Sequence, residues 1–342
     1  MEFIIDNQLS EVFEIARLMY YSYHPEELTH EKFMEHSLKL GISSSGLVEE
    51  TVSSVLKPMN KYLAAFQKQM VKSESDLFFF ENSGSLSLAF KYVNLLTKHK
   101  DWLVTTEHLD EDLIYSELAI QLLDEVPDTI QEIMRLLRES GVEAAVAWKC
   151  LLMLENPKQY LNVFIQIINQ NLPAYSAGVK EMQTIMAPLM EKFPQHPYQF
   201  FKGFIPFFEN ETEEKVKIIP TLIDIAGAIG PSKGPLYVGL RFHEVIQLIE
   251  NQDYVQEDLP PLLKVLGDSS KLEILKFLKQ APSYNLEIAK HMKLTPATTS
   301  HHMTILLTKK LVTCERRNKK AYYSINQNKI REITASLEAM LL

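Results

Sequence analysis

The sequence predicts a mainly α-helical protein in two unequal parts: a long helical N-terminal domain with a small β element, and a short C-terminal domain. Three observations predict this class. Apolar side chains follow helical spacing through most of residues 7–200, while residues 216–241 are rich in Ile and Val, and the last quarter alternates short helices with one hairpin pattern. A chain of 342 residues is also longer than a domain with a single hydrophobic core usually is.

In the N-terminal part we expect helices at 127–138, 142–154, 158–171 and 176–192, with breaks at Gly141 and at the Asn156-Pro157 pair. Two Gly-Pro pairs then occur within residues 216–241, and they predict strands joined by a turn at Gly230–Pro235. The segment 251–261 is polar and acidic and ends in Pro-Pro. It predicts a boundary near residue 255, and hence domains at 1–255 and 256–342.

Charge divides the chain in the same way. The net charge is −9, but residues 256–342 hold 14 Lys and Arg against 8 Asp and Glu, which leaves 21 basic and 36 acidic residues in 1–255. The C-terminal domain is therefore basic (+6) and the N-terminal domain acidic (−15). Residues 290–320 alone hold eight cations and one acid. This asymmetry indicates two modules that bind different partners, and it indicates that one of the two partners is a polyanion.

Several protein classes are disfavoured. No apolar run reaches 18 residues, and the acidic start lacks a basic leader region, so we expect neither a transmembrane helix nor a secretory signal. The only cysteines, Cys150 and Cys314, are far apart, which argues against a disulfide scaffold and favours a cytoplasmic protein. No phosphate loop, dinucleotide fingerprint or nucleophile elbow occurs. The spacing of His30 and His36 does not align them for zinc.

The C-terminal domain begins with three short helices. The first covers 269–280, with Asp268 or Ser269 as its cap and an apolar stripe of Leu272, Leu275 and Leu278. After Pro282, Ser283 is expected to cap a helix of two turns. Thr295-Pro296 then opens a third helix that runs to about Thr308. Two short helices joined by a tight turn, with the second sharply started, predict a helix-turn-helix.

In the third helix, Thr299, Met303 and Leu306 share a stripe that can face the core. The opposite face presents hydroxyls and an imidazole, which can bond base edges or phosphates in a major groove. Two strands follow, Leu311 to Arg316 and Ala321 to Ile325, and the tip between them is basic. A charged hairpin after the third helix makes this a winged helix-turn-helix. Residues 327–341 are expected to form a closing helix.

These segments resemble the ArsR family of bacterial winged-helix repressors. The resemblance rests on residues 262–278, 285–306 and 309–325, and within them on a Leu-Gly-Asp opening, a Ser-His-His in the third helix and a Tyr-Tyr-Ser-Ile strand. It covers the last quarter of the chain. It implies a dimer that binds inverted repeats and represses transcription until a signal releases it.

Two departures from the family pattern bear on the signal. The Cys-x-Cys pair that metal-sensing members carry at the start of the second helix is replaced by residues 283–286, Ser-Tyr-Asn-Leu. The last helix, 327–342, lacks the His ligands of the other usual site. We therefore expect no metal and no cofactor. The N-terminal extension of about 255 residues is a further departure, shared with a subset of the family that carries a large N-terminal domain.

The sequence thus predicts a non-enzymatic, cytoplasmic transcriptional regulator whose partners are double-stranded DNA, a second copy and an effector of unknown identity, with no membrane contact. Thr299 is included in the DNA-binding set although it also lies on the core stripe. The predicted DNA-binding residues are Thr295, Thr298, Thr299, Ser300, His301, His302, Thr304, Lys309, Lys310, Arg316, Arg317, Lys319 and Lys320.

Alternatives remain open. The N-terminal domain could bind a small molecule, or the winged helix could be a surface for a protein partner. His302 could be packed or bond a phosphate instead of reading a base. Cys150 is expected in the core, whereas Cys314 on the wing strand could sense redox state. An aromatic cluster is expected either in the core or around an apolar effector pocket: Phe200, Phe201, Phe204, Phe207 and Phe208.

Overall fold

The computed structural model describes residues 2–39, 46–81, 88–193, 215–230, 234–244, 259–317 and 320–341. It confirms a mainly helical chain with two small sheets. Buried apolar side chains form two separate clusters, one within residues 12–242 and the other within 262–333. The predicted boundary near residue 255 lies outside the described residues.

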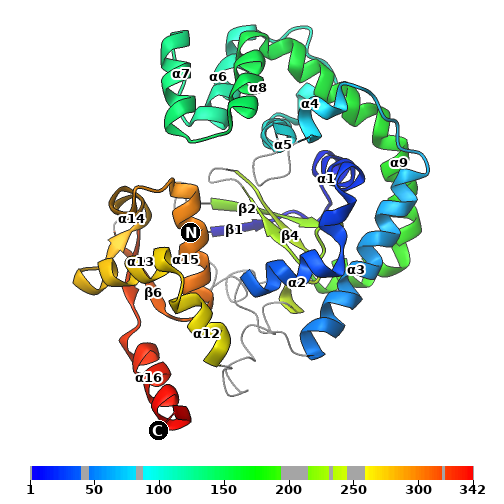
Figure 1. Ribbon diagram of the computed structural model, residues 1–342. Helices are drawn as coiled ribbons and strands as arrows, with labels where there is room; N and C mark the ends of the chain where they lie inside the picture. The colour runs from blue at the N-terminus through cyan, green and yellow to red at the C-terminus, as the bar shows by residue number, and fades with distance from the viewer. Residues whose placement is uncertain are drawn as a thin grey trace.

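The N-terminal part is an arc of helices around a small sheet (Figure 1). Its helices are α1 (Glu11–Tyr23), α2 (His30–Lys39), α3 (Gly46–Gln67), α4 (Asp76–Phe80), α5 (Leu88–Lys98), α6 (Glu111–Leu123), α7 (Ile130–Glu139), α8 (Ala144–Glu155) and α9 (Pro157–Lys192), with 3-10 turns at Pro25–Leu28 and Lys100–Leu103. Helices α3 and α9 lie side by side, and α1 packs against both of them. No described helix is long and apolar enough to cross a bilayer.

The predicted break between two helices near residue 173 is wrong, because α9 runs without interruption through Pro173 and Pro188. Proline removes one backbone hydrogen bond within a helix, but here tertiary packing compensates. Asn171 is buried, and its side chain bonds the backbone N–H and C=O of Val71. At Gly178 a Cβ atom would lie 2.9 Å from the Tyr62 ring, so only glycine allows α3 and α9 to approach this closely.

The sheet of the N-terminal part has the order β1-β2-β4-β3, with β1 (Glu2–Ile5), β2 (Lys215–Thr221), β3 (Ala228–Ile229) and β4 (Leu236–Gly239). The strands expected within 216–241 are confirmed. However, β2 pairs in parallel with β4 and with β1 from the start of the chain, a pairing the sequence did not predict. The connection from β1 to β2 therefore carries helices α1 to α9.

Helix α1 is fixed to the end of β2 by a buried carboxylate. Glu14 is fully buried and accepts hydrogen bonds from the Thr221 hydroxyl (2.7 Å) and from the amides of Leu222 (2.8 Å) and Ile223 (3.1 Å). One turn later, Arg17 pairs with Asp224 through two nitrogens, at 2.6 and 2.8 Å. These contacts join positions about 207 residues apart and close the fold of the N-terminal part.

The C-terminal part contains α12 (Leu259–Leu266), α13 (Ser269–Gln280), β5 (Ser283–Tyr284), α14 (Asn285–Met292), α15 (Pro296–Thr308), β6 (Val312–Arg317), β7 (Lys320–Ile325) and α16 (Gln327–Leu341). Its antiparallel sheet has the order β5-β7-β6. The helices predicted at 269–280 and 296–308 and the closing helix at 327–341 are confirmed. Leu272 is a correction: it is 40% exposed, and Ile274 takes the buried position beside Leu275 and Leu278.

Glu14 makes the stability of the N-terminal part depend on pH. Burial raises the pKa of Glu14 to about 7, against 4.5 for the free side chain, so the folded chain holds a proton that the unfolded chain releases. Stability should therefore fall as the pH rises from about 5 to 7, at up to about 1.4 kcal/mol per pH unit. Chemical denaturation across this range should show that Glu14→Gln lacks this slope, whatever its absolute stability. Equal slopes in both proteins would contradict an ionising Glu14.

Candidate nucleic-acid interface

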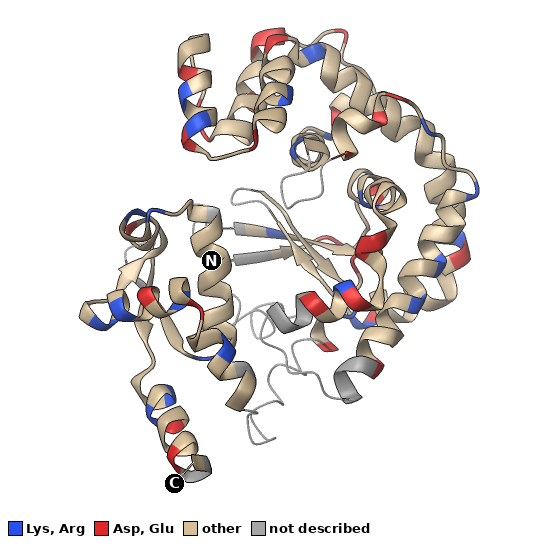
Figure 2. Ribbon diagram, in the orientation of Figure 1, with Lys and Arg blue, Asp and Glu red and all other residues tan. Residues whose placement is uncertain are grey.

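Helices α13, α14 and α15 form a helix-turn-helix around an apolar core. Ile274, Leu278, Ile288, Met303 and Leu306 are all buried in this core. Asp268 caps α13 as predicted, because its carboxylate accepts from the Lys271 amide at 3.0 Å. Figure 2 shows that the helices of this part carry more Lys and Arg than Asp and Glu.

The start of α14 differs from the sequence prediction. Ser283 does not cap the helix but lies in β5, where it pairs with Tyr323 of the wing strand β7. Tyr284 takes the cap position, and its amide donates to the Glu287 carboxylate at 3.3 Å. The helix ends at Met292, and the residue that caps it, Lys293, has a left-handed φ of 55°. The turn into α15 is thereby tight, as a helix-turn-helix requires.

The start of α15 is fixed by local chemistry. The Thr295 hydroxyl accepts from the Thr298 amide at 3.1 Å, and its oxygen lies 2.8 Å from the Thr298 hydroxyl. Pro296 occupies the first helical position, where no amide donor is needed. The N-terminus of α15 is thus well defined, and the positive end of its helix dipole can favour an anion such as a phosphate.

The exposed face of α15 is confined to its first half. Thr298 and His301 are exposed, but Ile305, seven residues after Thr298 on the same face, is buried at 5%. The second half of that face is therefore covered. Ser300, His302 and Thr304 are half-buried. Of the predicted side chains on α15, Thr298 and His301 are the two best placed to meet a duplex.

Thr299 is fully buried, and its hydroxyl has no hydrogen-bond partner among the described residues. The core stripe predicted for Thr299, Met303 and Leu306 is confirmed. The inclusion of Thr299 among the DNA contacts is wrong for this conformation, because its side chain points away from solvent.

Asn285 is a residue that the sequence reasoning missed. Its amide nitrogen donates to the Pro296 carbonyl at 3.1 Å and to the Ser300 hydroxyl at 2.9 Å, so the first residue of α14 holds the first turn of α15. Thr304 in turn donates to the Ser300 carbonyl. A polar amide at the first position of this short helix was the available signal. Ser300 and Thr304 therefore have hydroxyls already engaged within the protein.

His302 is half-buried between α15 and the start of α13. Burial, with a further contribution from Lys271, lowers the pKa of His302, although Asp268 opposes this shift. Its Nδ1 is buried without a described hydrogen-bond partner. The neutral imidazole is thus favoured near pH 7. Of the alternatives left open, this environment favours a packed histidine over one that reads a base.

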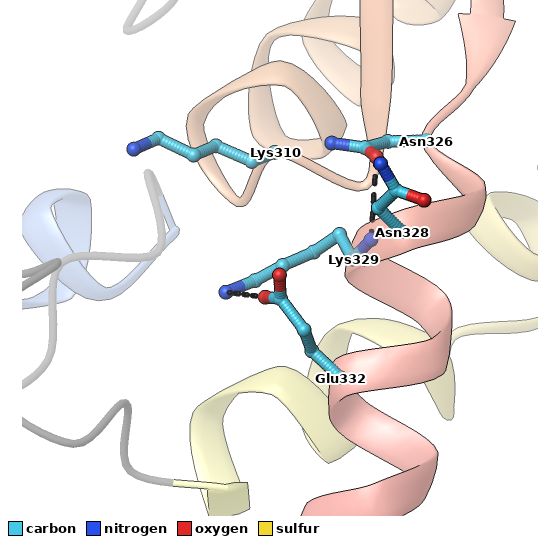
Figure 3. A pocket seen from close by; sticks show the side chains of 5 residues that line it. All are labelled: Lys310, Asn326, Asn328, Lys329 and Glu332. Carbon is cyan, nitrogen blue, oxygen red and sulfur yellow. Dashed lines mark hydrogen bonds and ion pairs between the residues drawn. The ribbon is translucent and has the colours of Figure 1, made fainter.

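Lys309 is a correction to the predicted phosphate contacts, whereas the contact of Lys310 stays a prediction. Lys309 is only 5% exposed, so its ammonium is not presented to solvent. Lys310 is exposed but lines a hollow with Asn326, Lys329 and Glu332 at the start of α16. Figure 3 shows Lys310 and Lys329 extending to the same side of this hollow, with Lys329 paired to Glu332 at 3.3 Å. A 13-residue helix is about 20 Å long, so both lysines lie far from the exposed start of α15.

The predicted wing is confirmed as an antiparallel hairpin. Strands β6 and β7 are in register, with Arg316 opposite Ala321 and Arg317 opposite Lys320. The backbones of three of the four wing cations are therefore placed on adjoining strands. The fourth, Lys319, lies outside the described residues.

The remaining candidates do not form a second site. Cys150 is buried as predicted, and burial raises the pKa of its thiol to about 11, so the reactive thiolate is disfavoured. Cys314 is half-exposed on β6. Within the described ranges, no group of three His, Cys, Asp or Glu side chains could hold a metal ion. The aromatic cluster Phe200, Phe201, Phe204, Phe207 and Phe208 lies outside the described residues.

The role of Asn285 can be tested by Asn285→Ala. We expect the free energy of unfolding to fall by about 1–2 kcal/mol, because the variant lacks two hydrogen bonds worth about 1 kcal/mol each. Denaturant titration would measure this change, and Asn328→Ala, an exposed asparagine of α16, is the matched control. Equal stability of the two variants would show that Asn285 does not hold α15.

Comparison with known proteins agrees with this geometry. The family model described as "Bacterial regulatory protein, arsR family" matches residues 268–313. The arsenical resistance operon repressor of Staphylococcus aureus is 33% identical over 81 residues, which are 24% of this chain and 78% of the relative. That of Staphylococcus xylosus is 33% identical over 82 residues, 24% of this chain and 79% of the relative. No solved structure matches the chain.

The matched segment contains α13, α14 and α15, the helices that build the exposed interface. The relatives are covered over most of their length, whereas three quarters of this chain have no counterpart in them. The chain therefore belongs to the arsR family of bacterial regulatory proteins, a family of DNA-binding transcriptional regulators.

Proposed function

We propose that this protein is a sequence-specific repressor that binds an inverted-repeat operator as a homodimer. The observation that carries the proposal is the exposed first half of α15, with Thr298 and His301, followed along the chain by a basic hairpin. The two relatives are named as operon repressors, which supports the same direction of regulation. In this proposal residues 256–342 form the DNA-binding domain and residues 1–255 form a regulatory domain.

In this proposal the N-terminal half of α15 enters a major groove. The Thr298 hydroxyl and the His301 imidazole are short polar groups that reach base edges, and Thr295 lies beside the helix N-terminus, where a phosphate is favoured. Ser300 and Thr304 contribute mainly by fixing the helix, since they are half-buried, unlike Thr298, and their hydroxyls bond within the protein. Arg316, Arg317, Lys319 and Lys320 of the wing supply attraction to the neighbouring backbone.

A second copy places a second α15 one helical turn of DNA away, about 34 Å along the duplex. This spacing matches an operator with two-fold symmetry. A cytoplasmic location and the absence of enzymatic activity are part of the same proposal.

The releasing signal is proposed to differ from that of the metal-sensing members. The start of α14 offers a hydroxyl, a phenol and an amide in place of the thiolates that soft metal ions prefer. The two cysteines of the chain belong to different apolar clusters, because Cys150 lies in the N-terminal core and Cys314 packs against the C-terminal one. These residues do not fit the family's usual metal sites.

One contact favours a regulatory role for the N-terminal part. Gly141, in the turn between α7 and α8, lies so near Thr295 that a Cβ atom there would be 3.6 Å from the threonine methyl group. The N-terminal part thus touches the cap of α15, at the end proposed to meet DNA. A ligand or protein partner that shifts this turn would change access to α15. In this alternative, binding at the N-terminal part controls DNA binding by the winged helix.

The wing is tested by replacing Arg316, Arg317, Lys319 and Lys320 together with Ala. Binding should weaken on every DNA sequence, and the slope of log affinity against log salt should flatten by about 0.9 for each phosphate that the wing no longer neutralises. Fluorescence anisotropy at several salt concentrations, on operator and random duplexes, measures both effects. A variant with full affinity and an unchanged slope would contradict wing docking.

His301→Ala should act differently, because a base contact carries sequence information. We expect discrimination at one operator position to fall by about 1–3 kcal/mol, with little change on random DNA. Selection from a random duplex pool with each protein would show the altered position. His291→Ala, on the exposed surface of α14, is the control, and the same preference in both variants would remove His301 from the readout.

A further inference from the structure

The N-terminal part touches the winged helix at the start of α15, the end proposed to meet DNA. Figure 1 shows α7 and α8 at the end of the arc that lies above α14 and α15. Gly141, in the turn between α7 and α8, is so near that a Cβ atom built on it would stand 3.6 Å from the methyl group of Thr295, which is an ordinary van der Waals distance. Thr295 is the N-cap of α15. The contact therefore lies on the residue that begins the candidate DNA-binding helix.

The two residues suit this close approach. Thr295 directs its hydroxyl to Thr298, from whose amide it accepts a hydrogen bond at 3.1 Å, and its methyl group is left for contacts outside α15. Gly141 has a φ of 69°, a left-handed conformation that favours glycine, and it has no side chain to hold the turn away. The Gly141 amide donates to the Arg138 carbonyl at 3.3 Å, so the contact is one of backbone surface against a methyl group.

A duplex and the turn between α7 and α8 compete for the same place. If α15 enters the major groove by its first half, it lies between two phosphate backbones in a groove about 12 Å wide. The positive end of its dipole favours a phosphate at the N-cap. An α-helix with its side chains is about 10–12 Å across, so α7 and α8 in contact with the cap fill the space that this backbone would need. DNA can reach the start of α15 only after the turn has moved away.

We propose that this contact is autoinhibitory. In the closed form, which the structure shows, the turn between α7 and α8 covers the start of α15, and DNA binds the open form, in which the two parts have separated. The inference deepens the proposed function and rests on it, because it assigns a regulation to the same DNA-binding helix. By thermodynamic linkage, whatever favours separation raises the affinity for DNA, and DNA in turn favours separation.

The two parts can separate without unfolding. Each has its own apolar cluster, so the open form leaves both cores intact. Residues 245–258 join the two described parts in sequence, and such a short connection keeps the turn near α15 at an effective concentration of about millimolar order. Net charges of −15 in residues 1–255 and +6 in residues 256–342 add a mutual attraction. A small contact is then populated in the free chain, and a duplex can displace it.

The first test locks the closed form with a disulfide in the full chain. Gly141→Cys and Thr295→Cys are combined with Cys150→Ala and Cys314→Ala, which remove the natural thiols. The methyl carbon of Thr295 stands where a cysteine Sγ would lie, so little movement is needed to bridge the pair. Mild oxidation should form the bond within one chain, as non-reducing electrophoresis and mass spectrometry would show.

A random-sequence duplex at low salt is the DNA probe, because phosphate attraction dominates binding there. The oxidised chain should bind this duplex at least tenfold more weakly than the reduced chain, and reduction should restore the affinity. The two single-cysteine variants, oxidised in the same way, control for oxidation itself and should not change. A disulfide that fails to form within the chain, or equal affinity of the oxidised and reduced forms, would overturn the proposal.

The second test loosens the contact without a covalent bond. Gly141→Asn tolerates the left-handed φ and adds atoms beyond Cβ, for which 3.6 Å leaves little room beside Thr295. It should favour the open form and raise the affinity for the same duplex at least twofold. Gly141→Ala is the matched control, because its Cβ alone makes an ordinary contact, and it should bind as the wild type does. Thermal unfolding establishes that each variant is folded, and equal affinity of all three proteins would overturn autoinhibition.

The two proposals fail in different ways. Formation of the disulfide is measured without DNA, so it reports the closed form separately from DNA binding. A reduced chain that binds no duplex would overturn the proposed function, and this inference with it. If the reduced chain binds and the oxidised chain binds equally well, the inference is lost and the proposed function is kept.

Discussion

The N-terminal part depends on one buried contact, the Glu14 carboxylate at the end of β2. Beyond Thr221 the chain leaves the sheet, so the amides of Leu222 and Ile223 have no strand partner, and burying them unpaired would cost about 1–3 kcal/mol each. Glu14 satisfies them and thereby fixes α1 against the sheet. Helices α3, α5 and α9 then pack around α1. The C-terminal part has a separate apolar cluster, so its fold does not depend on this contact.

The elements that the sequence predicted well are those whose ends are set by neighbouring residues. Asp268 begins α13, and Thr295 with Pro296 begins α15, because a short oxygen side chain or a proline acts within one turn of its own position. The wing strands and the closing helix follow from local alternation and spacing in the same way. The sequence predicts two helices where α9 is continuous, because Pro173 is a strong local signal for a break. The packing that overrides this signal comes from Val71 and Tyr62, about 100 residues away.

The same distinction between local and long-range determinants applies to the candidate nucleic-acid interface. Helical geometry placed Thr298 and His301 outside and Thr299 inside, since those directions follow from position alone. It could not show that Ile305 and Lys309 are covered, or that Asn285 reaches Ser300, because each depends on how separate elements pack. The pairing of β1 with β2 is of this kind too: two strands more than 200 residues apart carry no sequence signal of their neighbour.

The small size of the exposed surface on α15 has a consequence for how the protein would work. Two side chains per copy, each worth about 1–3 kcal/mol of discrimination, give one copy little specificity over random DNA. Two linked copies combine their contacts, so occupancy of an operator would depend strongly on the strength of the dimer. A domain that controls association can therefore control DNA binding without touching DNA. The N-terminal domain has a net charge of −15 and would be repelled by the duplex. Attraction to the duplex would then come from the wing and α15 of the basic domain.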